Sequence, residues 1–301
     1  MENFRYQKLI REMYEGKCIM IDGATATELE RRGVPQLKNA WNGGGALSHP
    51  NTLKEIHKEY VALGARVIIT NTFATCKHTL EDAEQGHNFE DLNSKAVMIA
   101  RQACEELKST ETLITGGISY WSFTGNSPSL EVLGENIYEQ ALIHKNSGVD
   151  LLMLEMMVDI DRMLVTLEAA KKSSLPVWVG LSCTRNLNGI ISLLNGSSLK
   201  AAILELKDKE IDLINIMHTE IPYVSTCLDI LKSNWGGLIG VYAHSGKMKN
   251  TKWTFNSIIS PKEYSKQASI WIEKGINLIG GCCGITTEHM RYIAGKNFKN
   301  D

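Results

Sequence analysis

Residues 276–284 read Ile276-Asn277-Leu278-Ile279-Gly280-Gly281-Cys282-Cys283-Gly284, a short apolar run that stops at two adjacent cysteines between glycines. The apolar half is typical of a buried strand, so both sulfur atoms are predicted to lie at the carboxyl end of that strand. Glycine on either side lets the backbone turn tightly there. The segment therefore predicts a strand that delivers two thiols to one end of a sheet.

Similar apolar runs precede this segment and alternate with amphipathic stretches. We expect strands at 18–22, 66–71, 112–118, 149–155, 177–182, 213–217, 238–242 and 276–280. Helical patterns occupy 51–63, 89–107, 134–147, 159–172, 198–207, 224–233 and 260–274. This alternation predicts an α/β fold, a single (β/α)8 TIM barrel, which needs about 250 residues. An open doubly wound sheet is disfavoured, because no Gly-x-Gly-x-x-Gly follows the first strand. We assign residues 1–301 to one barrel domain, with 1–16 as a helix before the first strand.

Composition excludes several classes of protein. Lys and Arg number 32 against 34 Asp and Glu, and a net charge of −2 gives no field that would attract nucleic acid or an anionic membrane. The apolar runs are too short to span a membrane, and the first residues lack the apolar core of a signal peptide. Seven cysteines without regular spacing argue against a secreted disulfide framework. The chain is therefore expected to be cytoplasmic.

Polar and metal-capable residues gather at the predicted strand ends, which is where (β/α)8 barrels carry their chemistry. They include Asp22, Asn71, Thr72, Glu155, Cys183, His218, His244, Cys282 and Cys283. Paired thiolates suit Zn²⁺ and leave room for a third ligand and a substrate. A glycine-rich turn with two inert buried thiols is the alternative interpretation.

With these residues in view, the chain resembles the homocysteine S-methyltransferase family, a group of zinc-dependent barrels, from Asp22 to about Ala294. Four motifs carry the resemblance, and together they are specific. They are Asp22-Gly23-Ala24-Thr25-Ala26-Thr27-Glu28-Leu29-Glu30-Arg31-Arg32-Gly33, Thr70-Asn71-Thr72-Phe73, Leu151-Leu152-Met153-Leu154-Glu155, and Gly280 to Gly284 followed by Thr287-Glu288-His289-Met290-Arg291.

The resemblance implies a metal site of three residues: the closing cysteine pair and one cysteine at the end of the sixth strand. Here, counting back from Pro222 and Val224 puts that position on His218, whereas counting from Asn215 puts it on Ile216, which cannot bind metal. We prefer the first count and expect a Zn²⁺ site of His218, Cys282 and Cys283, with an open fourth position. Cys183 is a fallback ligand. Loss of metal binding, with His218 a solvated loop residue, is the alternative.

A second departure from the family pattern follows the seventh strand, where the chain reads Tyr242-Ala243-His244-Ser245-Gly246-Lys247. This loop would border the substrate pocket. His244 could be a second metal ligand, a donor to the substrate or an ordinary loop histidine.

The resemblance also implies which residues hold the substrates. Asp22, Glu28 and Glu155 are expected near the ammonium of homocysteine, although Glu28 could instead lie on a solvated helix face. Glu155 lies in an apolar strand, where an unpaired carboxylate is costly and calls for a cation. Thr72, Phe73, Trp121 and Tyr242 complete the predicted substrate site, and aromatic faces suit a cationic methyl donor. Further aromatic candidates are Trp41, Tyr120 and Trp253.

The resulting expectation is a zinc-dependent S-methyltransferase that forms methionine from homocysteine. The donor would be S-methylmethionine, S-adenosylmethionine or a betaine-like compound, and no catalytic residue is expected beyond the metal site. Methylation of another small thiol or selenol, or a non-catalytic ligand-binding homologue, are the alternatives. Small molecules are the expected partners, without nucleic acid or membrane, and a monomer is favoured.

Overall fold

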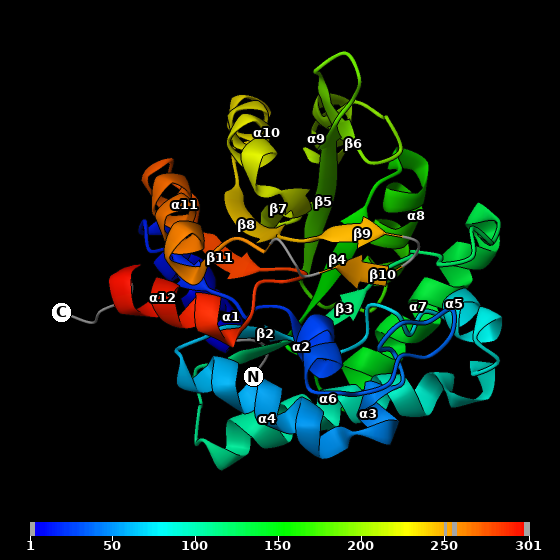
Figure 1. Cartoon of the computed structure of the whole chain (residues 1–301). Helices are drawn as coiled ribbons and strands as arrows, with labels where there is room; N and C mark the ends of the chain where they lie inside the picture. Colours follow the sequence, from blue (N-terminus) through cyan, green and yellow to red (C-terminus); the bar gives the residue numbers. More distant parts are fainter. Residues whose placement is uncertain (1–3, 250–251, 255–257, 298–301) are drawn as a thin grey trace.

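The structure is a computed structural model that describes residues 4–249, 252–254 and 258–297. Its centre is a ring of strands surrounded by helices (Figure 1). In the described part of the chain, eight parallel strands follow the order β1-β11-β8-β7-β5-β4-β3-β2. Their bounds are β1 (Ile19–Met20), β2 (Val67–Ile69), β3 (Leu113–Ile118), β4 (Leu151–Met157), β5 (Val177–Arg185), β7 (Leu213–Glu220), β8 (Leu238–His244) and β11 (Leu278–Gly281).

The ring closes between β1 and β2. Ile21 forms a parallel bridge with Val67. The N–H of Arg66 donates to the carbonyl of Met20 at 2.8 Å, and the N–H of Asp22 donates to that of Val67 at 3.1 Å. The predicted (β/α)8 barrel is therefore confirmed.

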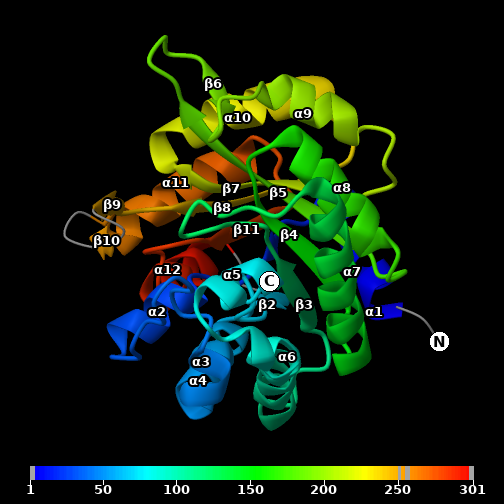
Figure 2. The same ribbon diagram turned by 90° about the vertical axis from the view of Figure 1, so that its right-hand side faces the viewer.

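Helices cover the outside of the ring, as Figure 2 shows. The main ones are α4 (Pro50–Ala62), α6 (Phe89–Glu106), α7 (Leu130–Ser147), α8 (Ile160–Lys171), α9 (Leu199–Leu206), α10 (Ile221–Asn234), α11 (Pro261–Glu273) and α12 (Thr287–Asn297). Shorter helices lie in the first two loops: α2 (Thr25–Arg31), α3 (Gly45–Ser48), α5 (Lys77–Asp82) and η1 (Gly86–Asn88). Local sequence signals fix where several of these helices begin. At α11, for example, Ser260 forms a capping box with Glu263, and Pro261 is the first helical residue.

The floor of the barrel is packed and capped. Helix α1 (Phe4–Tyr14) buries Tyr6, Leu9 and Met13 against the interior side chains of the strands. The indole N–H of Trp178 donates to the hydroxyl of Tyr6 at 3.0 Å. The predicted N-terminal helix is thus present from Phe4, and its residues 1–3 lie outside the described part.

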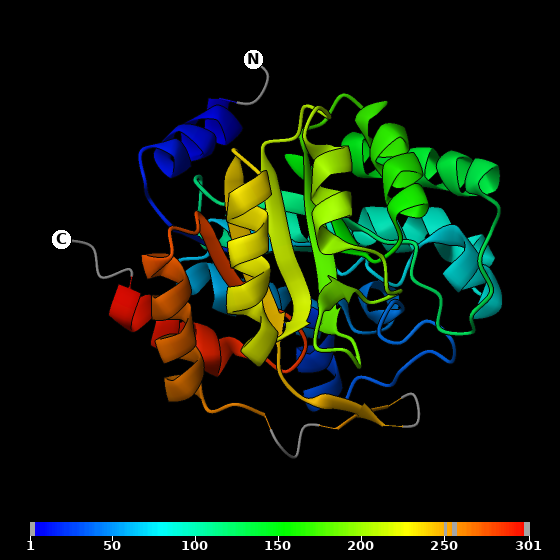
Figure 3. The same cartoon turned by 90° about the horizontal axis from the view of Figure 1, so that it is seen from above.

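Two hairpins extend the opposite end of the barrel. β6 (Ile191–Leu193) pairs antiparallel with the extended end of β5. β9 (Lys247–Lys249) and β10 (Lys252–Thr254) form a second hairpin after β8. Figure 3 shows α1 at one end of the barrel and the β9–β10 hairpin at the other. Both hairpins follow the carboxyl ends of strands, so they stand on the side where barrels carry their sites.

Among the described residues, the structure contains no helix with both the length and the hydrophobicity needed to cross a bilayer.

Candidate metal and substrate site

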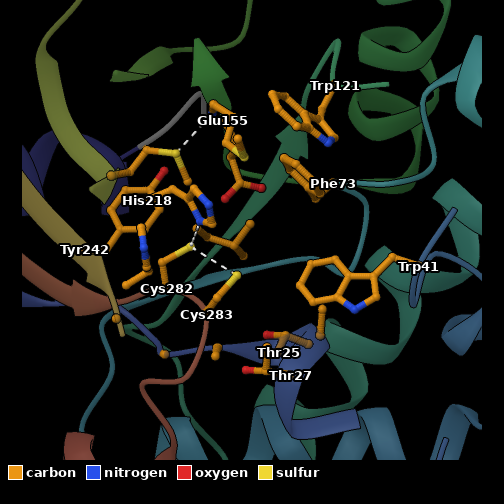
Figure 4. Close-up of a pocket in the computed structure, with 18 of the residues that line it drawn as sticks. Thr25, Thr27, Trp41, Phe73, Trp121, Glu155, His218, Tyr242, Cys282 and Cys283 are labelled. Atoms are coloured by element: carbon orange, nitrogen blue, oxygen red, sulfur yellow. Dashed lines mark hydrogen bonds between the residues drawn. The ribbon is translucent and has the colours of Figure 1, made fainter. Parts of the chain in front are cut away.

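The carboxyl ends of the strands surround a cavity of about 540 Å³. Eight of the ten residues predicted for the site line it: Asp22, Phe73, Trp121, Glu155, His218, Tyr242, Cys282 and Cys283. Figure 4 shows His218, Tyr242 and the two cysteines on one wall, Trp41, Phe73 and Trp121 on the other, and Thr25 and Thr27 below. The cavity therefore sets a wall of sulfur and nitrogen atoms opposite an aromatic wall.

His218, Cys282 and Cys283 form a cluster that could hold a metal ion. One ligand atom from each lies within 4.8 Å of the others. The His218 Nδ1 to Cys282 Sγ distance is 3.4 Å, and the two Sγ atoms are 3.8 Å apart. Around a tetrahedral zinc, two sulfur ligands lie about 3.8 Å apart, and a sulfur and a nitrogen ligand about 3.6 Å. The cysteines are free thiols, so the donor set fits a thiophilic divalent cation.

The two thiols do not titrate alike. Contact with Cys283, and then the nearby His218, holds the pKa of the Cys282 thiol well below its ordinary value. The interaction with Cys282, followed by burial, raises the pKa of Cys283 well above it. Metal ligation requires thiolates, so a bound cation would displace the protons of these thiols.

Two bulges position the site. The register of β4 against β5 shifts between Leu154 and Met157, and that of β7 against β8 shifts between Met217 and Glu220. Each bulge inserts one extra residue, so Glu155 and Met156 both face the cavity, as do Met217 and His218. The second residue of each pair is left-handed, with φ of 54° at Met156 and 41° at His218. Strained backbone of this kind clusters at functional sites.

Glu155 is a buried carboxylate aimed into the cavity. It is 8% exposed, and the described residues offer it neither a hydrogen-bond partner nor an ion pair. Burial, and then Cys282 and Asp22, raises the pKa of Glu155 well above its ordinary value. Asp22 differs, because its Oδ2 accepts from the N–H of Ile69 at 2.7 Å. Burial nevertheless raises the pKa of Asp22.

Tyr242 and His244 lie on the same wall of the cavity as His218 and the two cysteines. The hydroxyl of Tyr242 is buried and has no hydrogen-bond partner among the described residues. His244 lines the cavity, and its ring stacks on that of His218 at a centroid distance of 4.4 Å. Burial, and then His218, lowers the pKa of His244 to about 3. The ring of His244 therefore packs directly against that of His218.

Several predicted residues lie away from the cavity lining. Both carboxylate oxygens of the fully buried Glu28 are held by Arg31 and Arg32, with nitrogen–oxygen distances from 2.8 Å. The hydroxyl of Thr72 donates to the carbonyl of Gly117 at 2.7 Å. Neither Glu28 nor Thr72 lines the cavity, so their contact with the substrate stays a prediction. Tyr120 is buried, and the side chain of Trp253 lies outside the described part.

The alternative ligands also lie elsewhere. Ile216 is fully buried in the core between sheet and helices. The thiol of Cys183 interacts with Cys227 of α10, which raises its pKa. Of the residues considered, His218 is the one that the structure brings to the cysteine pair.

Other lining residues were not predicted as site residues. They include Thr25, Met156, Met217 and Glu220. All but Thr25 lie at or just beyond a strand end, so strand position was the available signal, but nothing in the sequence ranked them above their neighbours.

A comparison with protein families decides the kinship of the chain. The family model described as homocysteine S-methyltransferase matches residues 19–296. The chain belongs to the homocysteine S-methyltransferase family. The expected resemblance, and with it a methyltransferase-type enzyme, is confirmed.

The relatives of this chain match nearly its whole length. Homocysteine S-methyltransferase 1 from Zea mays is 25% identical over 93% of this chain and 94% of its own. Selenocysteine methyltransferase from Astragalus bisulcatus is 25% identical, over 92% of each. The metallated homocysteine methyltransferase MmuM from Escherichia coli superposes with a TM-score of 0.79, covering 96% of this chain and all of that one. At 19% identity, the last match bears on the fold alone.

Proposed function

We propose that this chain transfers a methyl group from a small sulfonium or quaternary ammonium donor to the thiolate of homocysteine, forming methionine. We further propose that zinc, held by His218, Cys282 and Cys283, is the cofactor. The observation that carries the proposal is a single cavity that joins this cluster to the unpaired Glu155 and to an aromatic wall. Its volume lies within the usual range of small-molecule sites, about 300–1,000 Å³.

The acceptor would bind through its ammonium group. A buried carboxylate without a partner is costly, and a cation in hydrogen-bond contact removes that cost. Glu155 is such a carboxylate, so the ammonium of an amino acid would stabilise its charged form. Asp22 also lines the cavity, with its Oδ2 held by the N–H of Ile69. The free hydroxyl of Tyr242 would offer one more hydrogen bond to the acceptor.

The thiol end of the acceptor would lie at the metal cluster. When bound, zinc lowers the pKa of a coordinating thiol and so favours the nucleophilic thiolate. His218 contributes a neutral ligand whose orientation is fixed by the left-handed backbone and by stacking on His244. The residues around the cluster would thus hold the thiol in place for methyl transfer.

The donor would lie against the aromatic wall. Trp41, Phe73, Trp121 and Phe123 line this side of the cavity, and the described lining contains no lysine or arginine. Aromatic faces attract sulfonium and ammonium cations, and among the described lining residues no fixed positive charge opposes them. S-methylmethionine, S-adenosylmethionine and betaine-like compounds all fit this chemistry.

The proposal is tested by metal content and turnover measured together. Wild type, His218→Ala and Cys282→Ser are each assayed for bound zinc and for methionine formed from homocysteine and S-methylmethionine. We expect about one zinc per chain in wild type, with both zinc and turnover lost in the variants. Cys183→Ser is the matched control and should keep both. Zinc retained in full by His218→Ala would contradict the ligand set.

Methylation of a selenol is the second candidate. It is favoured by the Astragalus relative, whose name specifies selenocysteine, and by the neutral His218 in the metal cluster. A selenol ionises more readily than a thiol, so it depends less on the metal for activation. Comparing kcat/KM for homocysteine and selenocysteine in the same assay decides between the two acceptors.

Monomeric state, small-molecule partners only and a cytoplasmic location remain predictions. Size-exclusion chromatography with light scattering tests the first of these.

A further inference from the structure

Met217 joins the two bulges through its sulfur atom. Its side chain is 1% exposed and lines the cavity next to His218. Its Sδ accepts a hydrogen bond from the N–H of Met156 at 3.0 Å and another from the hydroxyl of Ser182 at 3.1 Å. One thioether on β7 therefore holds the backbone of β4 directly after Glu155.

The bonded residue needs such support. Met156 has φ of 54°, which is costly for a residue with a side chain, so the surroundings must hold it there. Its N–H also lies within the bulge, where the regular β4–β5 ladder is interrupted. A buried N–H without an acceptor is costly as well. The sulfur of Met217 supplies that acceptor.

The strand between the two bulges leaves room for this contact. Gly180 lies on β5, between β4 and β7. A Cβ at Gly180 would lie 2.7 Å from Cγ of Met217 and 2.9 Å from the hydroxyl of Tyr242. The interior is thus shaped so that Met217 can reach past β5 to β4.

We propose that Met217 is a positioning residue that fixes the direction of Glu155 relative to the metal cluster, by accepting the N–H of Met156. Glu155 directly precedes Met156, and His218 directly follows Met217, so one bond sets the spacing of the two ends of the acceptor. The substrate part of this proposal rests on the proposed function, whereas the hydrogen bond itself does not.

Two substitutions separate this role from simple packing. Leucine nearly preserves the volume and apolar character of Met217 but cannot accept a hydrogen bond. Glutamine is more polar, and its side-chain oxygen can accept one. If Met217 only packs, Met217→Leu should keep a KM for homocysteine closer to wild type than Met217→Gln does. If Met217 positions Glu155, Met217→Gln should stay closer to wild type. We expect Met217→Leu to raise the KM for homocysteine about tenfold, with a smaller change in kcat.

The hydrogen bond is read directly by amide exchange at Met156. We expect exchange at least about tenfold faster in Met217→Leu than in wild type, and slow exchange in Met217→Gln. Met153→Leu is the matched control, because Met153 also accepts a side-chain hydrogen bond, from Asn215 at 3.3 Å, but does not line the cavity. Ser182→Ala removes the other donor and should leave both readouts near wild type.

The outcomes are distinct. Slow exchange at Met156 in Met217→Leu overturns the proposal. A lower KM for homocysteine in Met217→Leu than in Met217→Gln overturns it as well. If Met217→Leu does not fold, Met217→Gln decides: slow exchange supports the proposal and fast exchange overturns it. If wild type does not turn over homocysteine, the proposed function fails, while the exchange experiment still decides the role of Met217.

Discussion

Glu155 and Glu28 are both buried carboxylates in motifs that resemble the same family, yet their surroundings differ. Glu28 is held by Arg31 of its own helix and by Arg32, which caps that helix, and Arg32 also pairs with Glu59 at 2.8 Å. Glu155 has only the cavity in front of it. Removing one partner of a buried pair is strongly destabilising, whereas an unpaired buried carboxylate is costly until a cation binds it.

Exchanging each carboxylate for its amide separates the two roles. We expect Glu155→Gln to raise the KM for homocysteine at least about tenfold, because a buried charge pair with the ammonium is lost. Glu28→Gln should instead lower the unfolding midpoint and leave KM near wild type. Steady-state kinetics and thermal unfolding of both variants provide the measurements. A larger rise in KM for homocysteine in Glu28→Gln than in Glu155→Gln would indicate that Glu28 contacts the substrate directly.

The position of His218 beside the cysteine pair was predictable, although the backbone feature that places it there was not. Counting from Pro222 reached it, whereas counting from Asn215 reached Ile216. His218 occupies a bulge that interrupts the register of β7. A bulge depends on pairing with neighbouring strands, so no local sequence signal reveals it.

At the scale of elements, apolar runs identified every barrel strand, because a strand buried on both faces has few polar residues. The hairpins were missed. Asn188-Gly189 lies in the turn between β5 and β6, with Gly189 at φ of 79°, and this dipeptide is a strong hairpin signal. Helix α7 begins earlier than expected, because Ser129 accepts from the N–H of Val132 and caps it.

Helix α4 carries a buried histidine that makes stability depend on pH. His57 is fully buried, and neither ring nitrogen has a partner among the described residues. Burial lowers the pKa of His57 from 6.5 to about 4. Between these values the unfolded chain binds a proton that the folded chain does not, so stability falls as the pH falls from 6.5 to about 4.

We expect His57→Leu to reduce this acid sensitivity. The difference in unfolding free energy between pH 7 and pH 4 should shrink by on the order of 3 kcal/mol. Urea unfolding at both pH values measures it, with the exposed His87→Leu as the control. Equal acid losses in wild type and His57→Leu would mean that another group carries the dependence.

At the scale of the whole molecule, the candidate metal site of His218, Cys282 and Cys283 links two parts of the ring. His218 comes from β7, and the cysteine pair follows β11, with β8 between them. A cation bound to all three would tie these strands together at the mouth. Since the cluster is assembled by folding, binding there stabilises the folded chain.

Metal removal should therefore lower stability. We expect a chelator to lower the thermal midpoint of wild type by several degrees and zinc to restore it. Cys282→Ser, which lacks a ligand, should respond to neither. Differential scanning calorimetry with and without chelator is the measurement. A wild-type midpoint that ignores the chelator would contradict metal binding by this cluster.

The packed floor under α1 has a consequence for the order of events. With that end filled by Tyr6, Leu9, Met13 and the interior side chains, both substrates and both products must pass through the mouth. Glu155 is buried, whereas Trp41, Phe73 and Trp121 are partly exposed, so the proposed acceptor site lies deeper than the aromatic wall. We expect the acceptor to enter before the donor, and the spent donor to leave before the methylated product.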